Sequence, residues 1–400
     1  MKRILLPLAL AATLLAACAK TPDWVATWAT ALQVAEPHNL PPEPGLAGNS
    51  FRQIVQVSIG GSQLRLHLSN LFNETPTEIL GVEIARAQTP GASPEIVPDS
   101  RVELTFGGSR SVTMAAGGEA VSDPVKFKLE DRDNLAITIH YGAVAPMPLT
   151  SHPGSRTTSY IALGDTQDFS APAAKTAHWY TISSIDVVPR RESAAIAVLG
   201  DSITDGRGTT TDGQDRWTDQ LSRSLLEDPR TDNIAVLNFG LGGNCVLQGG
   251  LGPTGRSRYE RDLFGHPGVK YIILFEGTND LGGSRDGVRT AEEIREVWTE
   301  IIGKAHERGI KVFGATVSSA VGSFYDRDGT GEHEKGRQAL NAWIREGGAF
   351  DGVIDFDRIT AGPDDPARIN PAFLFENDWL HLNAAGYEHM GRSIDHALFY

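Results

Sequence analysis

The stretch AAIAVLGDSI (194–203) decides the fold of the second half of this chain. Its first six residues are all apolar, and Gly200 and Asp201, which favour turns, follow them. A short apolar run that ends in a turn is typical of a strand buried on both faces of a sheet. The stretch therefore predicts a parallel sheet that helices cover on both sides.

The same alternation of apolar strands and amphipathic helices continues to the C-terminus. Strands are predicted at Ala194–Leu199, Ile234–Phe239, Tyr271–Phe275, Lys311–Val317 and Gly352–Phe356. Helices are predicted at Trp217–Leu226, Ala291–Arg308, Glu334–Glu346 and Ala384–Leu398. Thr290 and Glu293 have the spacing of a capping box at the start of the second helix. The pattern favours a flavodoxin-like, doubly wound sheet of five strands, in which ligands bind outside the carboxyl ends of the strands.

The preceding part of the chain has a β pattern. Val55–Ile59 and Leu64–Leu68 alternate with polar residues on either side of Gly60-Gly61, which predicts a hairpin. Further strands are predicted at Ile79–Ala85, Arg101–Phe106, Ser111–Met114, Val125–Leu129 and Leu135–Tyr141. Such short strands without intervening helices favour an antiparallel β-sandwich of jelly-roll type. We expect the sandwich over residues 21–190 and the α/β domain over residues 191–400.

The N-terminus has the layout of an export signal. Lys2 and Arg3 precede the apolar run Ile4–Ala17, which is too short to span a bilayer. Leu15-Ala16-Ala17-Cys18 resembles the lipobox of bacterial lipoproteins. The resemblance implies a signal peptide over residues 1–17, a lipid on Cys18, and a site in the outer membrane of a Gram-negative bacterium, because Ala19 is not aspartate. The alternative is an ordinary secretory signal with an incidental cysteine.

Composition narrows the class of protein. Hydrophobic residues make up 40% and charged residues 22% of the chain, as in soluble globular proteins. The formal net charge of −14 argues against nucleic acid as a partner and against a broad membrane-binding face, which leaves the lipid anchor as the expected membrane contact. If Cys18 carries a lipid, Cys245 has no disulfide partner, and we interpret it as a small buried thiol.

Polar residues follow three predicted strand ends and precede the last predicted helix. Ser202 could expose its hydroxyl at the sheet edge or cap a helix, and Asn279 could donate to an oxyanion or form an Asx turn. The glycines of Asn238–Asn244 allow a close approach to a ligand, or a tight turn. Asp378, three residues before His381, can orient that histidine as a base.

Four blocks in this order resemble the SGNH (GDSL) hydrolase family: GDSI (200–203), NFGLGGN (238–244), GTND (277–280) and DWLH (378–381). The resemblance covers about residues 194–400. The segment HPGSRTTSY (152–160) also resembles the sandwich that precedes this domain in some bacterial and fungal members.

The resemblance implies a role for each matching residue. Ser202 is the expected nucleophile, His381 its base and later acid, and Asp378 the residue that orients the histidine. The oxyanion hole is expected from the backbone N–H groups of Ser202 and Gly243 and the side chain of Asn279.

The chain departs from the family at two positions of interest. Asn244 stands where many members have aspartate, and Leu382 stands where proline often follows the histidine. Both are expected to line the pocket, so the substrate cannot be inferred from relatives. Arg156 and Arg216 could reach the pocket or form structural pairs.

The expected activity is hydrolysis of a carboxylic ester through an acyl-serine, without a metal or cofactor. The substrate is expected to be a small-molecule or carbohydrate ester with a short acyl group, because the loop 244–259 is rich in Gly and contains no Ile or Phe. Two alternatives stay open: an O-acyltransferase with the same triad, and a surface carbohydrate-binding protein with a vestigial hydrolase domain.

Overall fold

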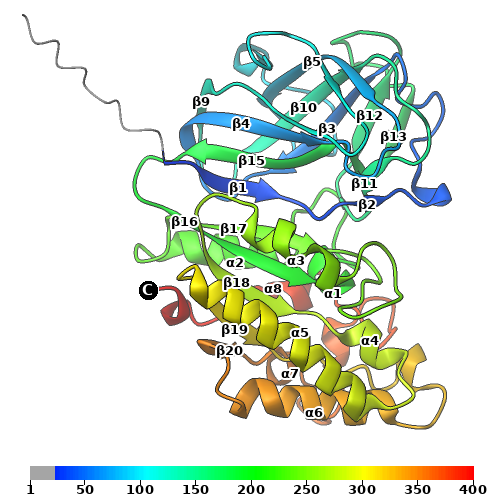
Figure 1. The fold of residues 1–400 in the computed structure, drawn as a ribbon, viewed down its shortest axis with the longest axis vertical. Coiled ribbons are helices and arrows are strands. Elements are labelled where there is room, and N and C mark those ends of the chain that lie inside the picture. Colours follow the sequence, from blue (N-terminus) through cyan, green and yellow to red (C-terminus); the bar gives the residue numbers. More distant parts are fainter. Residues whose placement is uncertain (1–22) are drawn as a thin grey trace, which may run out of the picture.

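A computed structural model describes residues 23–400 of the chain. The predicted signal peptide and Cys18 lie outside the described residues. A β-sandwich lies against an α/β half, with the sandwich uppermost in Figure 1. Within residues 23–400, no helix has the length and apolar character needed to cross a bilayer.

The α/β half contains a five-stranded parallel sheet. Its strands are β16 (Ala194–Gly200), β17 (Ile234–Gly240), β18 (Val269–Phe275), β19 (Lys311–Ala315) and β20 (Gly352–Ile354). Their order in the sheet is β17-β16-β18-β19-β20, and each neighbouring pair is parallel. This order confirms the predicted flavodoxin-like sheet.

Helices cover both faces of this sheet. They are α1 (Ser202–Asp205), α2 (Trp217–Glu227), α3 (Gly255–Phe264), α4 (Thr278–Gly282), α5 (Gly287–Glu307), α6 (Glu332–Glu346), α7 (Phe356–Ile359) and α8 (Ala384–Arg392). Ile196 and Val198 of β16 belong to a core cluster with residues of α2 and α8. Ala197 and Leu199, which alternate with them, belong to the cluster that contains the apolar stripe of α5. The continuous apolar run of the sequence is therefore buried on both sides.

Two predicted helix ends are wrong. Helix α5 begins at Gly287, because the Asp286 side chain caps it by accepting from the backbone N–H of Arg289 at 3.2 Å. Thr290 therefore lies inside the helix and is not its cap. Helix α8 ends at Arg392, and Asp395 starts a separate 3₁₀ turn by accepting from the backbone N–H of Ala397.

The sandwich half is antiparallel throughout, as predicted. Its strands are β1 (Val25–Ala29), β2 (Gln33–Val34), β3 (Ser50–Gln56), β4 (Gly61–Ser69), β5 (Thr77–Arg86), β6 (Val102–Leu104), β7 (Val112–Met114), β8 (Glu119–Val121), β9 (Val125–Leu129), β10 (Asn134–Tyr141), β11 (Thr150–His152), β12 (Ser159–Ala162), β13 (Ala174–Thr176), β14 (Trp179–Tyr180) and β15 (Ile182–Val188). The largest sheet has the order β13-β12-β3-β10-β5-β6, with β7 also paired to β5. The second has the order β1-β15-β4-β8, with β9 also paired to β4. A third sheet, β14-β11-β2, lies on the side that faces the α/β half (Figure 1).

The hairpin predicted around Gly60-Gly61 is wrong. Strands β3 and β4 belong to different sheets, so the chain crosses the sandwich between them. The two glycines are required by close packing: a Cβ at Gly60 would lie 2.2 Å from the Leu129 carbonyl oxygen, and one at Gly61 would lie 2.6 Å from that of Val188. Two adjacent glycines occur both in tight turns and where the chain crosses close to other strands, so the sequence pattern alone does not distinguish the two.

The sandwich contacts the edge strand of the parallel sheet. Thr30, just after β1, forms a parallel bridge with Asn238 of β17. The Ser58 hydroxyl donates to the Val236 carbonyl at 2.9 Å and accepts from its N–H at 3.0 Å. The last sandwich strand ends at Val188, and β16 begins at Ala194. The expected boundary between residues 190 and 191 falls in this linker. That the two halves are separate domains stays a prediction.

Candidate active site

Ser202 lies at the carboxyl edge of the parallel sheet, directly after β16. It is the first residue of α1, and the Asp201 side chain caps this helix by accepting from the backbone N–H of Ile203 at 3.0 Å. The end of β17 packs closely beneath the turn, since a Cβ at Gly240 would lie 2.2 Å from the Asp205 nitrogen. The serine is therefore held on a short turn at the edge where ligands bind in such sheets.

Ser202, His381 and Asp378 form a hydrogen-bonded relay. The Ser202 Oγ lies 2.9 Å from the His381 Nε2, and the His381 Nδ1 lies 2.6 Å from the Asp378 Oδ2. The other carboxylate oxygen accepts from the backbone N–H groups of Leu380 and His381 at 2.9 and 2.8 Å. Because the carboxylate accepts at Nδ1, the neutral ring has its lone pair on Nε2, toward the serine hydroxyl.

The carboxyl group of Asp378 is ionised in the folded protein. Burial opposes ionisation, but hydrogen bonds from the ring and backbone of His381 and from the backbone of Leu380 outweigh it and lower the pKa of Asp378. A carboxylate at this position can stabilise an imidazolium that forms on His381.

The predicted oxyanion donors line the same cleft as the relay. Gly243 has a φ of +67°, a conformation that favours glycine. Within residues 23–400, the backbone N–H groups of Ser202 and Gly243 have no protein acceptor. The Asn279 Nδ2 donates to the Asn244 carbonyl at 2.7 Å, which leaves its second N–H available. The structure thus brings together all of the residues that the sequence predicted for the chemistry.

Tyr325 contributes a contact that the sequence did not predict. Its hydroxyl donates to the Asn279 Oδ1 at 2.7 Å, which fixes the orientation of that amide. Burial raises the pKa of the Tyr325 hydroxyl, so it stays a donor. The residue lies in a 3₁₀ turn between β19 and α6, Phe324–Asp326, and no motif marks it in the sequence.

Arg258 on α3 is the second residue that the sequence did not reveal. It is buried, and its guanidinium donates to the carbonyls of Gly200 at 3.0 Å and Phe239 at 2.6 Å. Its Nε donates to the Asn244 Oδ1 at 3.0 Å. One side chain therefore ties together the ends of β16 and β17 and the loop that carries Gly243.

The expectation that Asn244 and Leu382 line the pocket is wrong. Both are fully buried, and neither lines the cleft. The Asn244 Nδ2 donates to the carbonyls of Leu251 at 2.6 Å and Pro253 at 2.9 Å, so this residue holds the loop after β17 together. Its amide can donate to two carbonyls, which an aspartate could not do.

Buried acidic residues lie under the site. Burial raises the pKa of Glu276 to about 8, although Arg258 lies 3.6 Å away and opposes the shift. Burial also raises the pKa of Asp280 to about 6, against hydrogen bonds from the backbone N–H groups of Leu247 and Val246. Burial, reinforced by these carboxylates, raises the pKa of Cys245 to about 12, so its thiol is protonated and a poor nucleophile.

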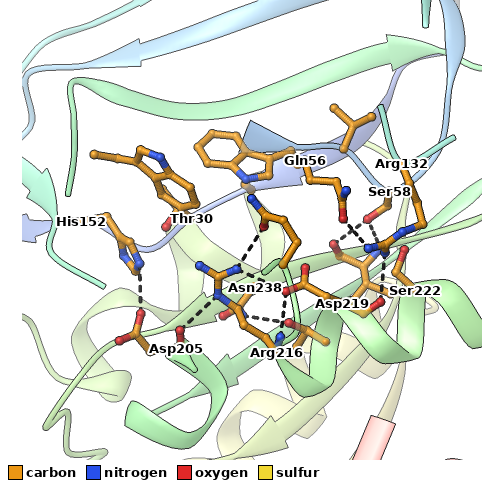
Figure 2. Close-up of a pocket in the computed structure, with 17 residues that line it drawn as sticks. Thr30, Gln56, Ser58, Arg132, His152, Asp205, Arg216, Asp219, Ser222 and Asn238 are labelled. Carbon is orange, nitrogen blue, oxygen red and sulfur yellow. Dashed lines mark hydrogen bonds and ion pairs between the residues drawn. The ribbon is translucent and has the colours of Figure 1, made fainter. Parts of the chain in front are cut away.

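The cleft has a volume of about 630 Å³ and is lined by both halves of the molecule. The α/β half contributes Ser202, Asp205, Arg207, Leu241, Gly242, Gly243, Cys245, Gly250, Leu251, Asn279, Gly283, Phe324, Tyr325, Leu380 and His381. The sandwich contributes Gln33, Glu36, Asn39, Pro153, Gly154, Arg156 and His178. Of the two arginines considered from sequence, Arg156 lines the cleft. Arg216 instead lies buried between the halves (Figure 2).

Asp205 joins the sandwich to the turn that carries the nucleophile. Figure 2 shows His152 of the sandwich pointing at this carboxylate, with its Nε2 3.0 Å from the Oδ1. The Arg156 Nη2 lies 2.8 Å from the other oxygen. Arg216 donates to the carbonyls of Asp205 and Ser155, one on each half. Burial opposes ionisation of Asp205, but Arg156 and His152 outweigh it and lower its pKa.

A second Ser-His-Asp set lies elsewhere in the α/β half. The Ser224 Oγ lies 2.7 Å from the His396 Nε2, and the His396 Nδ1 lies 3.4 Å from the Asp228 Oδ2. None of these residues lines the cleft described above. The set joins α2 to the C-terminal turn, and it shows that a serine–histidine contact alone does not make an active site.

The comparisons with known proteins concern the α/β half. Residues 198–389 match the GDSL-like Lipase/Acylhydrolase family, and this range contains the relay and the predicted oxyanion donors. No curated protein matches the chain.

Solved structures resemble about half of the chain. A putative lipolytic protein of the G-D-S-L family from Desulfitobacterium hafniense DCB-2 is 19% identical with a TM-score of 0.38, over 50% of this chain and 96% of that one. A carbohydrate acetylesterase family member from Sinorhizobium meliloti is 16% identical with a TM-score of 0.37, over 50% and 94%. The inhibitor-bound aryl esterase of M. smegmatis is 17% identical with a TM-score of 0.38, over 50% and 96%.

Proposed function

We propose that the α/β half, which matches the GDSL-like lipase/acylhydrolase family over residues 198–389, makes this protein a serine esterase that hydrolyses carboxylic esters through an acyl-serine intermediate. The observation that carries the proposal is the relay Ser202–His381–Asp378, with contacts of 2.9 and 2.6 Å, at the wall of an open cleft. A neutral serine hydroxyl needs such a base to attack an ester carbonyl at neutral pH.

In the first half of the reaction, the Ser202 Oγ attacks the carbonyl carbon while the His381 Nε2 takes the hydroxyl proton. The carbonyl oxygen becomes an oxyanion, which the backbone N–H groups of Ser202 and Gly243 and the free N–H of Asn279 can bind. The imidazolium on His381 is stabilised by the ionised Asp378. His381 then gives the proton to the leaving alcohol oxygen as the carbon–oxygen bond breaks, which leaves the acyl group on Ser202.

In the second half, water replaces the alcohol. The His381 Nε2 takes a proton from the water as its oxygen attacks the acyl carbon, and the same donors bind the second oxyanion. The proton returns to the Ser202 Oγ as the acyl-serine bond breaks, and the free acid leaves. No step requires a group beyond the side chains and backbone already named.

The proposed substrates have short acyl groups. Of residues 244–259, only Cys245, Gly250 and Leu251 line the cleft. With Leu241, Phe324 and Leu380 from other segments, Leu251 gives the cleft four large aliphatic or phenylalanine side chains, enough apolar surface for a short acyl chain. Burial of each further CH₂ of an acyl chain contributes about 0.8 kcal/mol, but only where apolar surface receives it. Hydrolysis of p-nitrophenyl esters from acetyl to dodecanoyl tests this: kcat/KM should fall beyond butyryl, and a steady rise with chain length would contradict a short-acyl site.

Titration of the released acid tests the proposed reaction itself. The protein should release one acid for each p-nitrophenol from p-nitrophenyl acetate in water, and acid release should persist when glucose is added as a competing acceptor. Loss of acid release in favour of acetylated glucose would instead indicate an O-acyltransferase. Absence of turnover on every carboxylic ester would contradict an esterase.

We also propose that the chain is exported and anchored by a lipid on Cys18. The support is the sequence pattern of residues 1–18, in which a basic start and a short apolar run precede the cysteine. Mass spectrometry of the mature protein should find Cys18 as the first residue with an acyl mass, and Cys18→Ala should remove that mass. A cut at another residue without an acyl mass would contradict the anchor.

A further inference from the structure

We propose that the sandwich half is the sugar-binding wall of the cleft, and that Glu36, Asn39 and His178 bind the hydroxyl groups of a carbohydrate alcohol in the ester. The proposal rests on the esterase function proposed above and names the class of alcohol that the same site accepts. It assigns a role in recognition to the half of the molecule that contributes no residue to the relay.

The two halves give the cleft walls of different chemistry. The sandwich contributes the polar side chains of Gln33, Glu36, Asn39, Arg156 and His178. The α/β half contributes the large apolar side chains of Leu241, Leu251, Phe324 and Leu380 beside the reacting residues. It also contributes two charged side chains, Asp205, which is paired with Arg156 of the sandwich, and the exposed Arg207. An ester with an apolar acyl part and a hydroxyl-rich alcohol part matches this division, because each part meets surface of its own polarity.

Glu36 and Asn39 form a fixed unit that combines acceptors and donors. The Glu36 carboxylate accepts from the Gln33 Nε2 at 2.5 Å and from the Asn39 Nδ2 at 2.8 Å. The Tyr180 hydroxyl donates to the Asn39 carbonyl at 2.6 Å, which holds the turn in place. Each carboxylate oxygen keeps a further lone pair, and the Asn39 amide keeps an N–H and its oxygen. Adjacent acceptors and donors of this kind suit neighbouring hydroxyl groups, each of which is both donor and acceptor.

His178 adds an acceptor to the same wall. Its Nδ1 lies 2.6 Å from the Pro153 carbonyl oxygen, which can only accept, so the neutral ring has its proton on Nδ1. Burial, reinforced by neighbouring histidines and Arg156, lowers the pKa of His178 against the effect of that hydrogen bond. The ring is therefore neutral near pH 7, and its Nε2 can accept a hydrogen bond from a hydroxyl group.

The position of this wall relative to Ser202 is fixed by the contacts at Asp205. Gly154 packs so closely against that carboxylate that a Cβ there would lie 1.9 Å from its Oδ1. Arg156, two residues later, pairs with the other oxygen at 2.8 Å. Because Asp205 lies in the same helical turn as Ser202, a sugar held by the sandwich is held at a constant distance from the nucleophile.

The experiment compares one ester whose alcohol has sugar hydroxyls with one whose alcohol has none. The substrates are singly acetylated methyl glycosides of glucose, xylose and galactose, and p-nitrophenyl acetate. The wall variants are Asn39→Ala, His178→Ala and Glu36→Gln, and each is compared with wild type. The control is His38→Ala: His38 lies in the turn Pro37–Asn39, is exposed and does not line the cleft. Melting temperatures show which variants fold, and the two histidine variants form a matched pair.

The measured quantity is the ratio of kcat/KM on the best glycoside ester to kcat/KM on p-nitrophenyl acetate. Loss of one hydrogen bond to a sugar hydroxyl should lower this ratio about five- to tenfold in each wall variant that folds, mainly through KM, and His38→Ala should keep the wild-type ratio. Wild-type ratios in all folded wall variants would overturn the sugar-binding wall. Turnover of p-nitrophenyl acetate with no turnover of any glycoside ester would also overturn it. Neither result would affect the esterase function, which fails separately if wild type hydrolyses no ester.

Discussion

In the cleft, the wall that carries Ser202, Asn279 and His381 is built mainly from segments that follow strands β16 to β19 or precede α8. The other wall comes from residues 33–39, 153–156 and 178 of the sandwich, which are far apart in sequence. In the proposed reaction, the first wall meets the reacting atoms, and the second meets the alcohol part of the ester. Variants of the first should therefore change kcat for every ester by the same factor, whereas variants of the second should change the preference between esters.

Loss of the base should have the largest effect. We expect His381→Ala to lower kcat by about 10⁶-fold, as removal of one member of such a triad does, and by the same factor for glycoside esters and p-nitrophenyl acetate. Steady-state kinetics on both substrates measures it. His396→Ala is the matched control, because this histidine also contacts a serine but lies outside the cleft. A loss that depends strongly on the alcohol would contradict the division between the walls.

Asp378→Asn should have the next largest effect. An amide can donate to the His381 Nδ1 and so favour the wrong tautomer, and the expected loss in kcat is about 10⁴-fold with KM little changed. The same pair of substrates should lose activity equally. A loss below tenfold would show that the hydrogen bond of 2.6 Å does not orient the base.

Asn279→Ala should lower kcat by about 10²–10³-fold, as removal of one oxyanion donor does. Tyr325→Phe should act in the same direction but less strongly, because it releases the Asn279 amide without removing it. The split between kcat and KM is the measurement. A rise in KM with kcat unchanged would mean that Asn279 binds the substrate in the ground state.

The smallest effect concerns stability and not turnover. The pKa of Glu276 in the folded protein, about 8, lies above the ordinary value of 4.5. The folded state then binds the proton of Glu276 more tightly than the unfolded state does. This proton therefore adds to the free energy of unfolding in full below pH 4.5, and its contribution is lost as the pH rises through 8. The melting temperature of wild type should fall more between pH 5 and 8.5 than that of Glu276→Gln. If the melting temperatures of wild type and Glu276→Gln changed equally with pH, the raised pKa of Glu276 would be contradicted. The control is Glu346→Gln, which removes a carboxylate at an exposed position.

The comparison of the walls also explains how much the sequence could predict. Ser202, Asn279 and the glycine segment 238–244 could be marked as candidates because parallel strands bring their carboxyl ends to one edge. Asp378 and His381 were marked by their spacing of three residues, and the role of each residue, with the choice of Gly243, came from the resemblance of the four blocks to the SGNH (GDSL) family. Tyr325 and Arg258 were missed because they act through contacts with Asn279 and Asn244 that no local pattern encodes.

The sandwich was predicted in type but not in its connections. The glycine pair at residues 60 and 61 fits both a hairpin and a close crossing, and only the packing against Leu129 and Val188 decides between them. The polar wall likewise depends on three distant segments that meet only in the folded chain. HPGSRTTSY (152–160) was noticed as a segment, but its contact with Asp205 could not be inferred from spacing.

The most direct test of the central claim is to identify the residue that an ester-like phosphonate modifies. Treatment of the intact protein with a fluorophosphonate, followed by peptide mass spectrometry, should give one adduct per chain, on Ser202. Ser224→Ala should be labelled as wild type, and Ser202→Ala should be unlabelled and inactive while keeping its melting temperature. An adduct on Ser224 or Cys245, or undiminished ester hydrolysis by Ser202→Ala, would contradict Ser202 as the nucleophile.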